Sequence, residues 1–395
     1  MNMSMSLFKK SFSKLKKYCE NQDFKGWDPY DGLNSWVIQK TPLGNSRFFR
    51  LVWIQFFKRS PINLRPLFSI KKDYNPKGLG LFLIGYCNLY AIYSKKKYLD
   101  KINFLTEEII KLKTKGYSGA CWGYNFDWQA RAFFQPKYTP TVVATTFIAE
   151  ALFKAYEVTK NEAYLETGIS TSKFVLTDLN KSYDDDGDFT FSYSPLDNTQ
   201  VYNAGLLGVK LLCLVYKYTK EPLLLENAKK VVAYVCKKQY SNGSWAYGTL
   251  PFHQWVDNFH TGYNLECIQI YQEISGNLDF QENITKGLNY YLKTFFTSEG
   301  KSKYYDKKLY PIDIHSPAQL VVTLFKLKKL KANRILVDKV LSWTISNMQS
   351  NDGSFYYQKK KLFSSKVPYI RWAQAWMFYA FSYHYLEFKS EYGKD

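Results

Sequence analysis

The sequence predicts an all-α fold, a single closed ring of about six helical hairpins with long aromatic loops at one end. The first observation is regular spacing: Gly80, Thr141, Asn203, Thr261, Ser316 and Trp372 lie 61, 62, 58, 55 and 56 residues apart, each near the start of an apolar helix. The second is a recurring order of apolar helix, short polar turn, amphipathic helix and aromatic loop. A period of about 60 residues is too long for tetratricopeptide, ankyrin or HEAT repeats, and fits hairpins with elaborated loops.

Two classes of helix alternate along the chain. Helices that are apolar almost all round are expected to be buried, and those with one apolar stripe to be peripheral. The apolar class comprises 82–95, 142–158, 204–218, 262–274, 318–330 and 373–386. The amphipathic class comprises 98–113, 162–179, 222–238, 279–296 and 334–348. We therefore expect an inner ring inside an outer ring, with a helix at 46–57 as the outer partner of the last inner helix.

The loops that join outer to inner helices are much longer than the turns at the opposite end. They span 116–140, 183–202, 240–260, 298–315 and 351–371, with short strands expected at 188–194, 244–248 and 353–358. All long loops should therefore lie at one end, where they form a cup. Every inner helix begins there, and its free N–H groups and dipole favour an anion.

Composition favours one large domain and an anionic partner. The chain has 395 residues and 46% hydrophobic content, without a linker-like segment. We expect a toroidal domain at 76–395 and an N-terminal extension at 1–75 packed on it. The net charge of +20 indicates an acidic glycan, a membrane surface or nucleic acid. The basic runs lack regular aromatic interleaving, so we do not expect nucleic acid as a partner.

The N-terminus allows two interpretations. It lacks the apolar core of a signal peptide, and no segment reaches the roughly 20 apolar residues of a membrane span. With six scattered cysteines interpreted as reduced, this predicts a cytoplasmic protein. Phe8, Phe12, Leu15 and Cys19 share one helix face, surrounded by lysines. Such a helix either docks on the protein or lies on the inner face of the membrane as a peripheral contact.

Two loops carry a recognisable motif. The segment 239–245 (QYSNGSW) has the QxxxGxW spacing of the terpene-cyclase repeat, and 349–355 (QSNDGSF) is a variant. Together with the hairpin order over 77–388, this resembles the (α/α)6-toroid superfamily. That superfamily includes six-hairpin glycosidases, polysaccharide lyases of the chondroitin and alginate type, sugar epimerases and terpene-cyclase or prenyltransferase toroids. The resemblance implies an (α/α)6 toroid, with the motif as a structural clasp between an outer helix and the following loop.

The isoprenoid members of that superfamily fit less well. The DxDD acid motif of hopene-type cyclases is absent, since 184–188 reads DDDGD. The Asp/Cys/His zinc set of protein prenyltransferases is not evident either. We therefore place an isoprenoid-handling function third, and we expect no metal and no cofactor.

The strongest candidate for chemistry is the segment 255–266 (WVDNFHTGYNLE), where a long loop enters an inner helix. Proton abstraction beside a uronate carboxylate needs a group on that carboxylate, a base and an acid. Asn, His, Tyr and Arg fill these roles in toroidal lyases. The resemblance thus implies His260 or His315 as base, Tyr263 as acid, and Asn258 with Arg371 on the carboxylate. The alternative is that Asn258 only caps the helix and His260 is structural.

Asp313 and His315 occupy the equivalent position one repeat later. The chain has four histidines, and two of them at matching positions favour a functional role. Aspartates at four loop ends also allow glycoside hydrolysis by a carboxylate pair. These residues are Asp127, Asp197, Asp257 and Asp313.

Further loop ends mix aromatic rings with polar groups, as sugar-binding sites do. The candidates for substrate binding are Trp122, Tyr124, Asp127, Arg131, Asp197, Tyr202, Trp245 and Trp372, with Asn258 and Arg371. Arg371 lies at an inner-helix start, where a cation is unfavourable. An anionic ligand would explain it, and the alternative is a salt bridge with Asp313 or another acid.

The sequence therefore predicts a carbohydrate-active enzyme that acts on an acidic surface polysaccharide or a lipid-linked glycan. Its chemistry would be lyase-like or epimerase-like, or hydrolysis by an Asp pair. A non-catalytic glycan-binding toroid in polysaccharide biosynthesis is the alternative of a different class.

Overall fold

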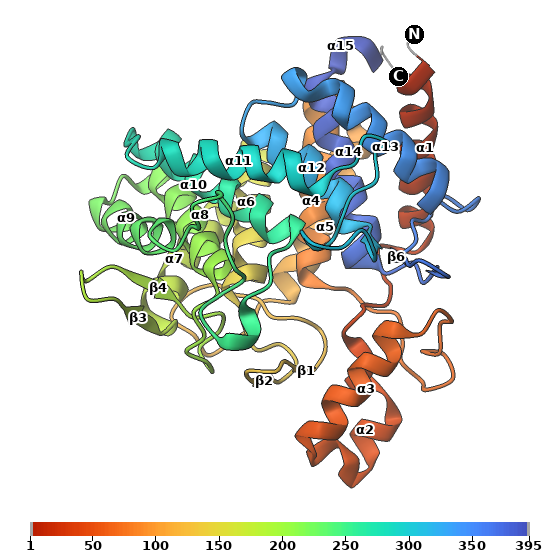
Figure 1. Cartoon of the computed structure of the whole chain (residues 1–395), viewed down its shortest axis with the longest axis horizontal. Helices are drawn as coiled ribbons and strands as arrows, with labels where there is room; N and C mark the ends of the chain where they lie inside the picture. Colours follow the sequence, from red (N-terminus) through yellow and green to blue (C-terminus); the bar gives the residue numbers. More distant parts are fainter. Residues whose placement is uncertain (1–2, 393–395) are drawn as a thin grey trace.

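The chain folds as a closed double ring of helices, an (α/α)6 toroid, in a computed structural model that describes residues 3–392 (Figure 1). The inner ring consists of α4 (Pro76–Tyr93), α6 (Val142–Thr159), α8 (Tyr202–Thr219), α10 (Asn258–Ser275), α12 (His315–Lys326) and α14 (Trp376–Glu387). A π-helical turn (Ile370–Ala375) precedes α14. Each inner helix packs on the next, and α14 packs on α4 to close the ring. The predicted fold class is thus confirmed.

The outer ring follows the predicted alternation in five hairpins. It contains α5 (Lys96–Lys111), α7 (Glu162–Lys173) with a π-helical turn (Phe174–Asp178), α9 (Pro222–Cys236), α11 (Gln281–Phe295) and α13 (Arg334–Met348). Asn75, Thr141 and Asp257 cap the inner helices α4, α6 and α10 with their side-chain oxygens. A residue in the left-handed conformation ends the same three helices: Ser94, Lys160 and Gly276.

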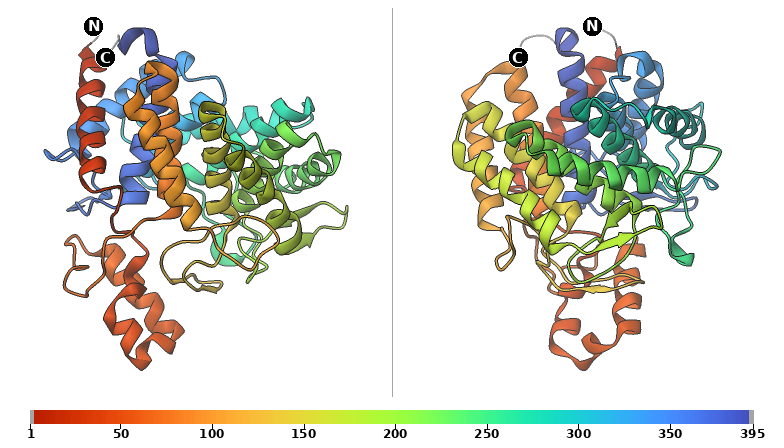
Figure 2. Two further views of the ribbon diagram at one scale, coloured as in Figure 1. Left: turned by 180° about the vertical axis from the view of Figure 1, so that it is seen from behind. Right: turned by 90° about the vertical axis from the view of Figure 1, so that its left-hand side faces the viewer.

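The sixth outer position is filled by α1 (Met3–Asn21), which packs against α13 and α14. The prediction that a helix at 46–57 would fill it is wrong. The corresponding helix α3 (Arg47–Arg59) belongs instead to a lobe with the short helix α2 (Trp36–Lys40) that projects from the toroid (Figure 2). Helix α1 therefore contributes to the same hydrophobic core as the rest of the toroid.

The apolar face of α1 lies inside the protein. Phe8, Phe12, Leu15 and Cys19 are at most 3% exposed, and the ring of Phe12 packs on Phe378 at 5.0 Å between centroids. This face is not available for a membrane, so a membrane contact through the apolar face of α1 is excluded. No helix within residues 3–392 has both the length and the apolar character to span a bilayer.

The long loops gather at one end of the toroid, and the lobe of α2 and α3 projects from the same end (Figures 1 and 2). Three small antiparallel sheets stiffen these loops. They pair β1 (Trp128–Gln129) with β2 (Phe134–Gln135), β3 (Lys181–Tyr183) with β4 (Phe189–Phe191), and β6 (Gln358–Lys359) with both β5 (Ile312–Asp313) and β7 (Ser364–Ser365).

The QxxxGxW segment is a clasp, as expected. The Gln239 amide donates to the carbonyl oxygens of Gly243 and of Asn283 in α11. The variant motif repeats the arrangement, because the Gln349 amide donates to the carbonyl oxygens of Gly353 and of Ser11 in α1. The two clasps hold α11 and α1 in equivalent places, which supports α1 as the sixth outer helix.

Gly243→Ala is expected to destabilise the fold more than Gly187→Ala. Both glycines have positive φ, +91° and +78°, so either alanine would cost about 1–2 kcal/mol in backbone strain. Only at Gly243 would the new Cβ also meet a backbone atom, the Lys286 carbonyl oxygen at 2.4 Å, whereas the space around Gly187 is open. Urea denaturation of both variants measures the difference; equal losses would contradict a clasp that depends on this close approach.

The axis of the inner ring holds a buried ion network. The Lys210 ammonium of α8 lies 2.7 Å from a carboxylate oxygen of Glu150 in α6 and 2.5 Å from one of Glu266 in α10. Lys326 of α12 pairs with the second oxygen of Glu150. Burial alone would raise the pKa of Glu150, but Lys210 and Lys326 lower it well below its usual range. Four inner helices are therefore joined by charges rather than by apolar contacts alone.

Candidate functional site

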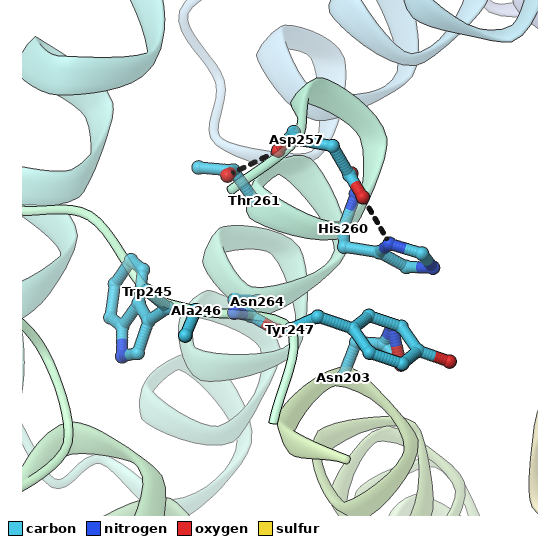
Figure 3. Close-up of a pocket in the computed structure, with 8 residues that line it drawn as sticks. All are labelled: Asn203, Trp245, Ala246, Tyr247, Asp257, His260, Thr261 and Asn264. Carbon is cyan, nitrogen blue, oxygen red and sulfur yellow. Dashed lines mark hydrogen bonds and ion pairs between the residues drawn. The ribbon is translucent and has the colours of Figure 1, made fainter. Parts of the chain in front are cut away.

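The candidate site lies at the loop end of the toroid, around the start of α10. Asp257 caps this helix with one carboxylate oxygen, which accepts the His260 backbone N–H at 2.9 Å. Its other oxygen lies 2.7 Å from Nδ1 of the His260 ring (Figure 3). A carboxylate can only accept, so Nδ1 carries the hydrogen. The lone pair of Nε2 is then free to take a proton, as a general base requires.

His260 is accessible and set among aromatic rings. Its side chain is 20% exposed, and its ring lies 4.7 Å from that of Tyr247 and 5.7 Å from that of Trp255. In Figure 3 the His260 and Tyr247 rings extend to the same side, and Trp245 points to the other. The imidazole therefore lies in a partly exposed region bordered by aromatic rings.

A groove of about 570 Å³ adjoins this region. Its walls come from the loop before α10 and the loop before α12. They include the rings of Tyr240, Phe252, Trp255 and Tyr305 and the polar groups of Asn242, Gln254, Asp306, Lys307 and Lys308. Aromatic surfaces with a few polar groups are typical of small-molecule sites. Trp255 connects the groove to His260.

His315 lies behind His260 and forms a second pair with Tyr263. The Tyr263 hydroxyl and His315 Nε2 are 3.0 Å apart. Burial raises the pKa of Tyr263 well above its ordinary value, and burial together with Lys77 lowers the pKa of His315. Both side chains are therefore neutral near pH 7. Phe259 stacks on His315 at 4.3 Å and touches the His260 ring at 4.2 Å, so the two histidines share one cluster.

Lys77 belongs to the same cluster and was not predicted. Its ammonium lies over the rings of Phe147, Trp376 and Tyr263, at 4.2, 5.4 and 5.5 Å from their centroids. Burial and then Arg371 lower its pKa well below the ordinary value. One sequence signal could have revealed Lys77. It lies at the start of α4, in a position equivalent to that of Arg371 before α14.

Arg371 has a different role from the one expected. Its guanidinium binds both carboxylate oxygens of Asp28, with nitrogen–oxygen distances of 2.6 and 2.8 Å, and this pair is buried. The salt bridge that we gave as the alternative explanation for Arg371 is therefore present, and its acid is Asp28. The pair fixes the N-terminal segment over the cup, where Tyr30 touches Trp372 at 5.7 Å between ring centroids. Arg371 is not free to bind a substrate carboxylate.

The predicted aspartates other than Asp257 accept hydrogen bonds from neighbouring residues. Asp197 accepts from the backbone and hydroxyl groups of Ser194 and Thr199. Asp127 accepts from the Lys137 backbone and from Gln39 of the N-terminal lobe. Asp313 is fully buried and accepts from Gln358, Trp372 and the His315 backbone. The structure gives no pair of free carboxylates among these residues, so the expected Asp pair is not supported.

Several predicted binding residues point away from the cup or lie at its edge. The indoles of Trp122 and Trp245 are buried and donate to the carbonyl oxygens of Ile109 and Val235 near the ends of outer helices. Asn258 accepts from Tyr291 of α11, and Tyr202 lies near Tyr234 and Tyr240. Arg131 is exposed on the β1–β2 hairpin. Tyr124 and Trp372 do lie in the cup, Tyr124 with its ring beneath the Arg371 guanidinium at 5.0 Å.

Asp313 is expected to make the free energy of unfolding depend on pH in the mildly acidic range. Burial raises its pKa to about 6, against the opposing hydrogen bonds from Gln358, His315 and Trp372. Between about pH 4, the pKa of an unfolded aspartate, and about pH 6, the folded state keeps a proton that the unfolded state loses. Stability therefore falls as pH rises through this window, by an amount of the order of 1 kcal/mol per pH unit.

Asp313→Asn is expected to remove this part of the pH dependence. Urea unfolding at about pH 4 and about pH 7 measures it. A variant whose unfolding free energy varies with pH as in the wild type would contradict an uncharged Asp313 at acid pH.

Comparison with known proteins identifies the fold class. No family model matches the chain, and no curated protein is similar to it in sequence. Solved structures are similar: a cellobiose 2-epimerase from Bacillus thermoamylovorans has a TM-score of 0.64 and 13% identity, over 81% of this chain and 90% of that one. A GH76 α-mannanase from Bacteroides thetaiotaomicron has 0.63 and 12%, over 82% and 89%. An unsaturated glucuronyl hydrolase specific for heparin has 0.63 and 11%, over 98% of each chain.

The protein is thus an (α/α)6 toroid of the same fold as these three structures. At 11–13% identity the likeness concerns the fold, and the site of this chain rests on its own residues.

Proposed function

We propose that this protein is a carbohydrate-active enzyme that abstracts a proton from a sugar carbon in the cup. The observation that carries the proposal is the pair of neighbouring dyads, Asp257–His260 and Tyr263–His315. One supplies a base with a free nitrogen lone pair, and the other supplies a neutral phenol as acid. The similar structures, an epimerase, a mannanase and a glucuronyl hydrolase, support a carbohydrate as substrate.

In the proposed reaction, Nε2 of His260 removes a hydrogen from a carbon beside a carbonyl or carboxylate group. Tyr263 donates its proton to the substrate while His315 Nε2 holds the phenol in place. The phenolate then regains a proton from water, and the His260 imidazolium releases one to water, which restores both groups. Delivery to the leaving oxygen gives a lyase, and delivery to the opposite face of the same carbon gives an epimerase. Both outcomes require one base and one acid, and the epimerase outcome requires them on opposite faces of the same carbon.

The substrate proposed here is an acidic oligosaccharide or polysaccharide, either free or attached to a lipid. Lys307 and Lys308 on the groove wall are cations that an acidic sugar in the groove would meet. This replaces the expected contact with Arg371, which Asp28 neutralises. A cytoplasmic location at the inner face of the membrane remains a prediction from the sequence.

The test is incubation with uronate-containing and neutral oligosaccharides in D₂O, followed by NMR and mass spectrometry. The expected result is either an inverted centre that carries deuterium, for an epimerase, or a new double bond at the carbon that lost its hydrogen, for a lyase. Incorporation of ¹⁸O from labelled water into the product without deuterium at carbon would replace the proposal with hydrolysis. Binding without any conversion of the sugars would favour the non-catalytic alternative.

A further inference from the structure

The N-terminal lobe exposes apolar side chains in a stripe. Phe48, Val52 and Phe56 lie four residues apart on α3 and are 76, 46 and 43% exposed. Residues at this spacing share one face of a helix. A neighbouring face is already used, because Trp53 and Phe57 pack on each other and on Phe68. Phe56 also stacks on Trp53 at 5.5 Å between ring centroids, whereas Phe48, at 76% exposed, is the most open residue of the stripe.

More exposed apolar groups surround the stripe. We define the docking lobe as residues 32–72, which include α2 and α3. Trp36, Leu43, Ile62 and Leu67 of the lobe are 46, 44, 68 and 73% exposed. The lobe thus carries seven of the sixteen large hydrophobic side chains that are exposed within residues 3–392. A concentration of this kind marks an interaction surface rather than scattered exposure.

The charge of the docking lobe has one sign. It contains eight Lys and Arg residues and no Asp or Glu. Among the basic residues, Lys40, Arg47, Arg59, Lys71 and Lys72 are exposed. Arg65 is buried against Asp31 and contributes no surface charge. Exposed cations around an apolar stripe match a bilayer with anionic headgroups, where each cation near the surface contributes about 1 kcal/mol.

The lobe is also placed to reach a flat surface. It projects beyond the loop end of the toroid in all three views (Figures 1 and 2). Its base is fixed by two buried ion pairs, Arg65 with Asp31 and Arg371 with Asp28. The lobe therefore presents its tip away from the body in a defined orientation, on the side of the cup.

We propose that the docking lobe binds an anionic lipid bilayer, with Phe48, Val52 and Phe56 inserted among the headgroups and the surrounding Lys and Arg on lipid phosphates. Binding in this orientation brings the loop end of the toroid to the membrane surface. If the proposed function holds, the cup would then meet a glycan that is attached to a membrane lipid. The docking itself does not depend on that function.

The test is sedimentation of the full chain with phosphatidylcholine vesicles, with and without phosphatidylglycerol. The protein is expected to sediment with the anionic vesicles at low salt and less at high salt, since salt screens exposed charges. The double variant Phe48→Ser with Val52→Ser is expected to bind at least about tenfold more weakly, because two apolar side chains no longer leave water. Ile335→Ser is the matched control, since Ile335 is 77% exposed on α13, outside the lobe.

A second pair of variants tests the charges. Lys40→Gln with Arg59→Gln is expected to weaken binding to anionic vesicles and to reduce its dependence on salt. Lys96→Gln with Lys97→Gln, exposed at the start of α5, removes the same charge elsewhere and should bind as the wild type. Circular dichroism verifies that all variants are folded. Absence of binding at low salt, equal binding to neutral vesicles, or unchanged binding by the Phe48/Val52 variant would overturn the proposal.

Discussion

Asp257→Asn is expected to lower kcat by about 10²–10⁴-fold, the range in which general acid–base catalysis contributes, while the protein stays folded. Asparagine still caps α10, because its amide oxygen can accept the His260 backbone N–H that Asp257 accepts at 2.9 Å. The amide nitrogen, however, donates, so it favours a bare Nδ1 and moves the ring hydrogen to Nε2. His260 then loses the free lone pair on Nε2.

The measurement is kcat and KM on the sugar that the deuterium experiment identifies. We expect the loss in kcat, with KM changed much less, because the ring keeps its place. His260→Gln should lose a similar factor, and the double variant little more, since the two residues act as one unit. Asp127→Asn is the control, an exposed loop position that bonds to Gln39 and the Lys137 backbone. Equal losses in Asp127→Asn and Asp257→Asn would refute the assigned base.

Lys210→Met is expected to destabilise the protein by about 3–5 kcal/mol, the usual effect of breaking a buried ion pair. The substitution leaves the Glu266 carboxylate buried without a cation and removes one of the two partners of Glu150. The matched control is Lys217→Met on the same helix. The Lys217 ammonium lies 4.0 Å from Glu157 and its side chain is 48% exposed, so a change of about 0–1 kcal/mol is expected.

Urea denaturation measures both variants. Adding Glu266→Gln to Lys210→Met should restore part of the loss, because Glu150 still has Lys326 and no bare carboxylate remains. Equal losses of unfolding free energy in the Lys210 and Lys217 variants would show that the buried ion network stabilises the fold no more than an exposed ion pair does. No recovery in the double variant would show that lost packing, and not the uncompensated charge, dominates.

The periodic part of the fold could be predicted because each hairpin is encoded locally. An apolar helix, a turn and an amphipathic helix follow one another in every repeat, so the pattern needs no knowledge of distant residues. The sixth outer helix could not be found in this way. Its apolar face, with Phe8 and Phe12, has the same pattern whether it covers a protein core or a bilayer, and its partners in α14 lie more than 350 residues later.

The candidate site was predictable to the extent that residue types decide it. His260, His315 and Tyr263 were named as candidates from residue type and position, but their pairing into the two dyads was not predicted. Arg371 shows the limit, because its partner Asp28 lies 343 residues away and no local signal connects them. Trp122 and Trp245 show another limit, since an aromatic residue in a long loop can face either the cup or the outer helices, and both face the outer helices.

The place of α1 in the ring also bears on how the chain is made. The ribosome makes α1 well before the helices that it packs against, α13 and α14. During translation Phe8, Phe12 and Leu15 must therefore stay uncovered, or be shielded by a chaperone, until α13 and α14 have emerged. Because α1 also contacts α15 (Lys389–Tyr392), these two helices lie close together. A circular permutant that links α15 to α1 and opens the short turn between α4 and α5 would place α1 soon after its partners, and should need less help to fold.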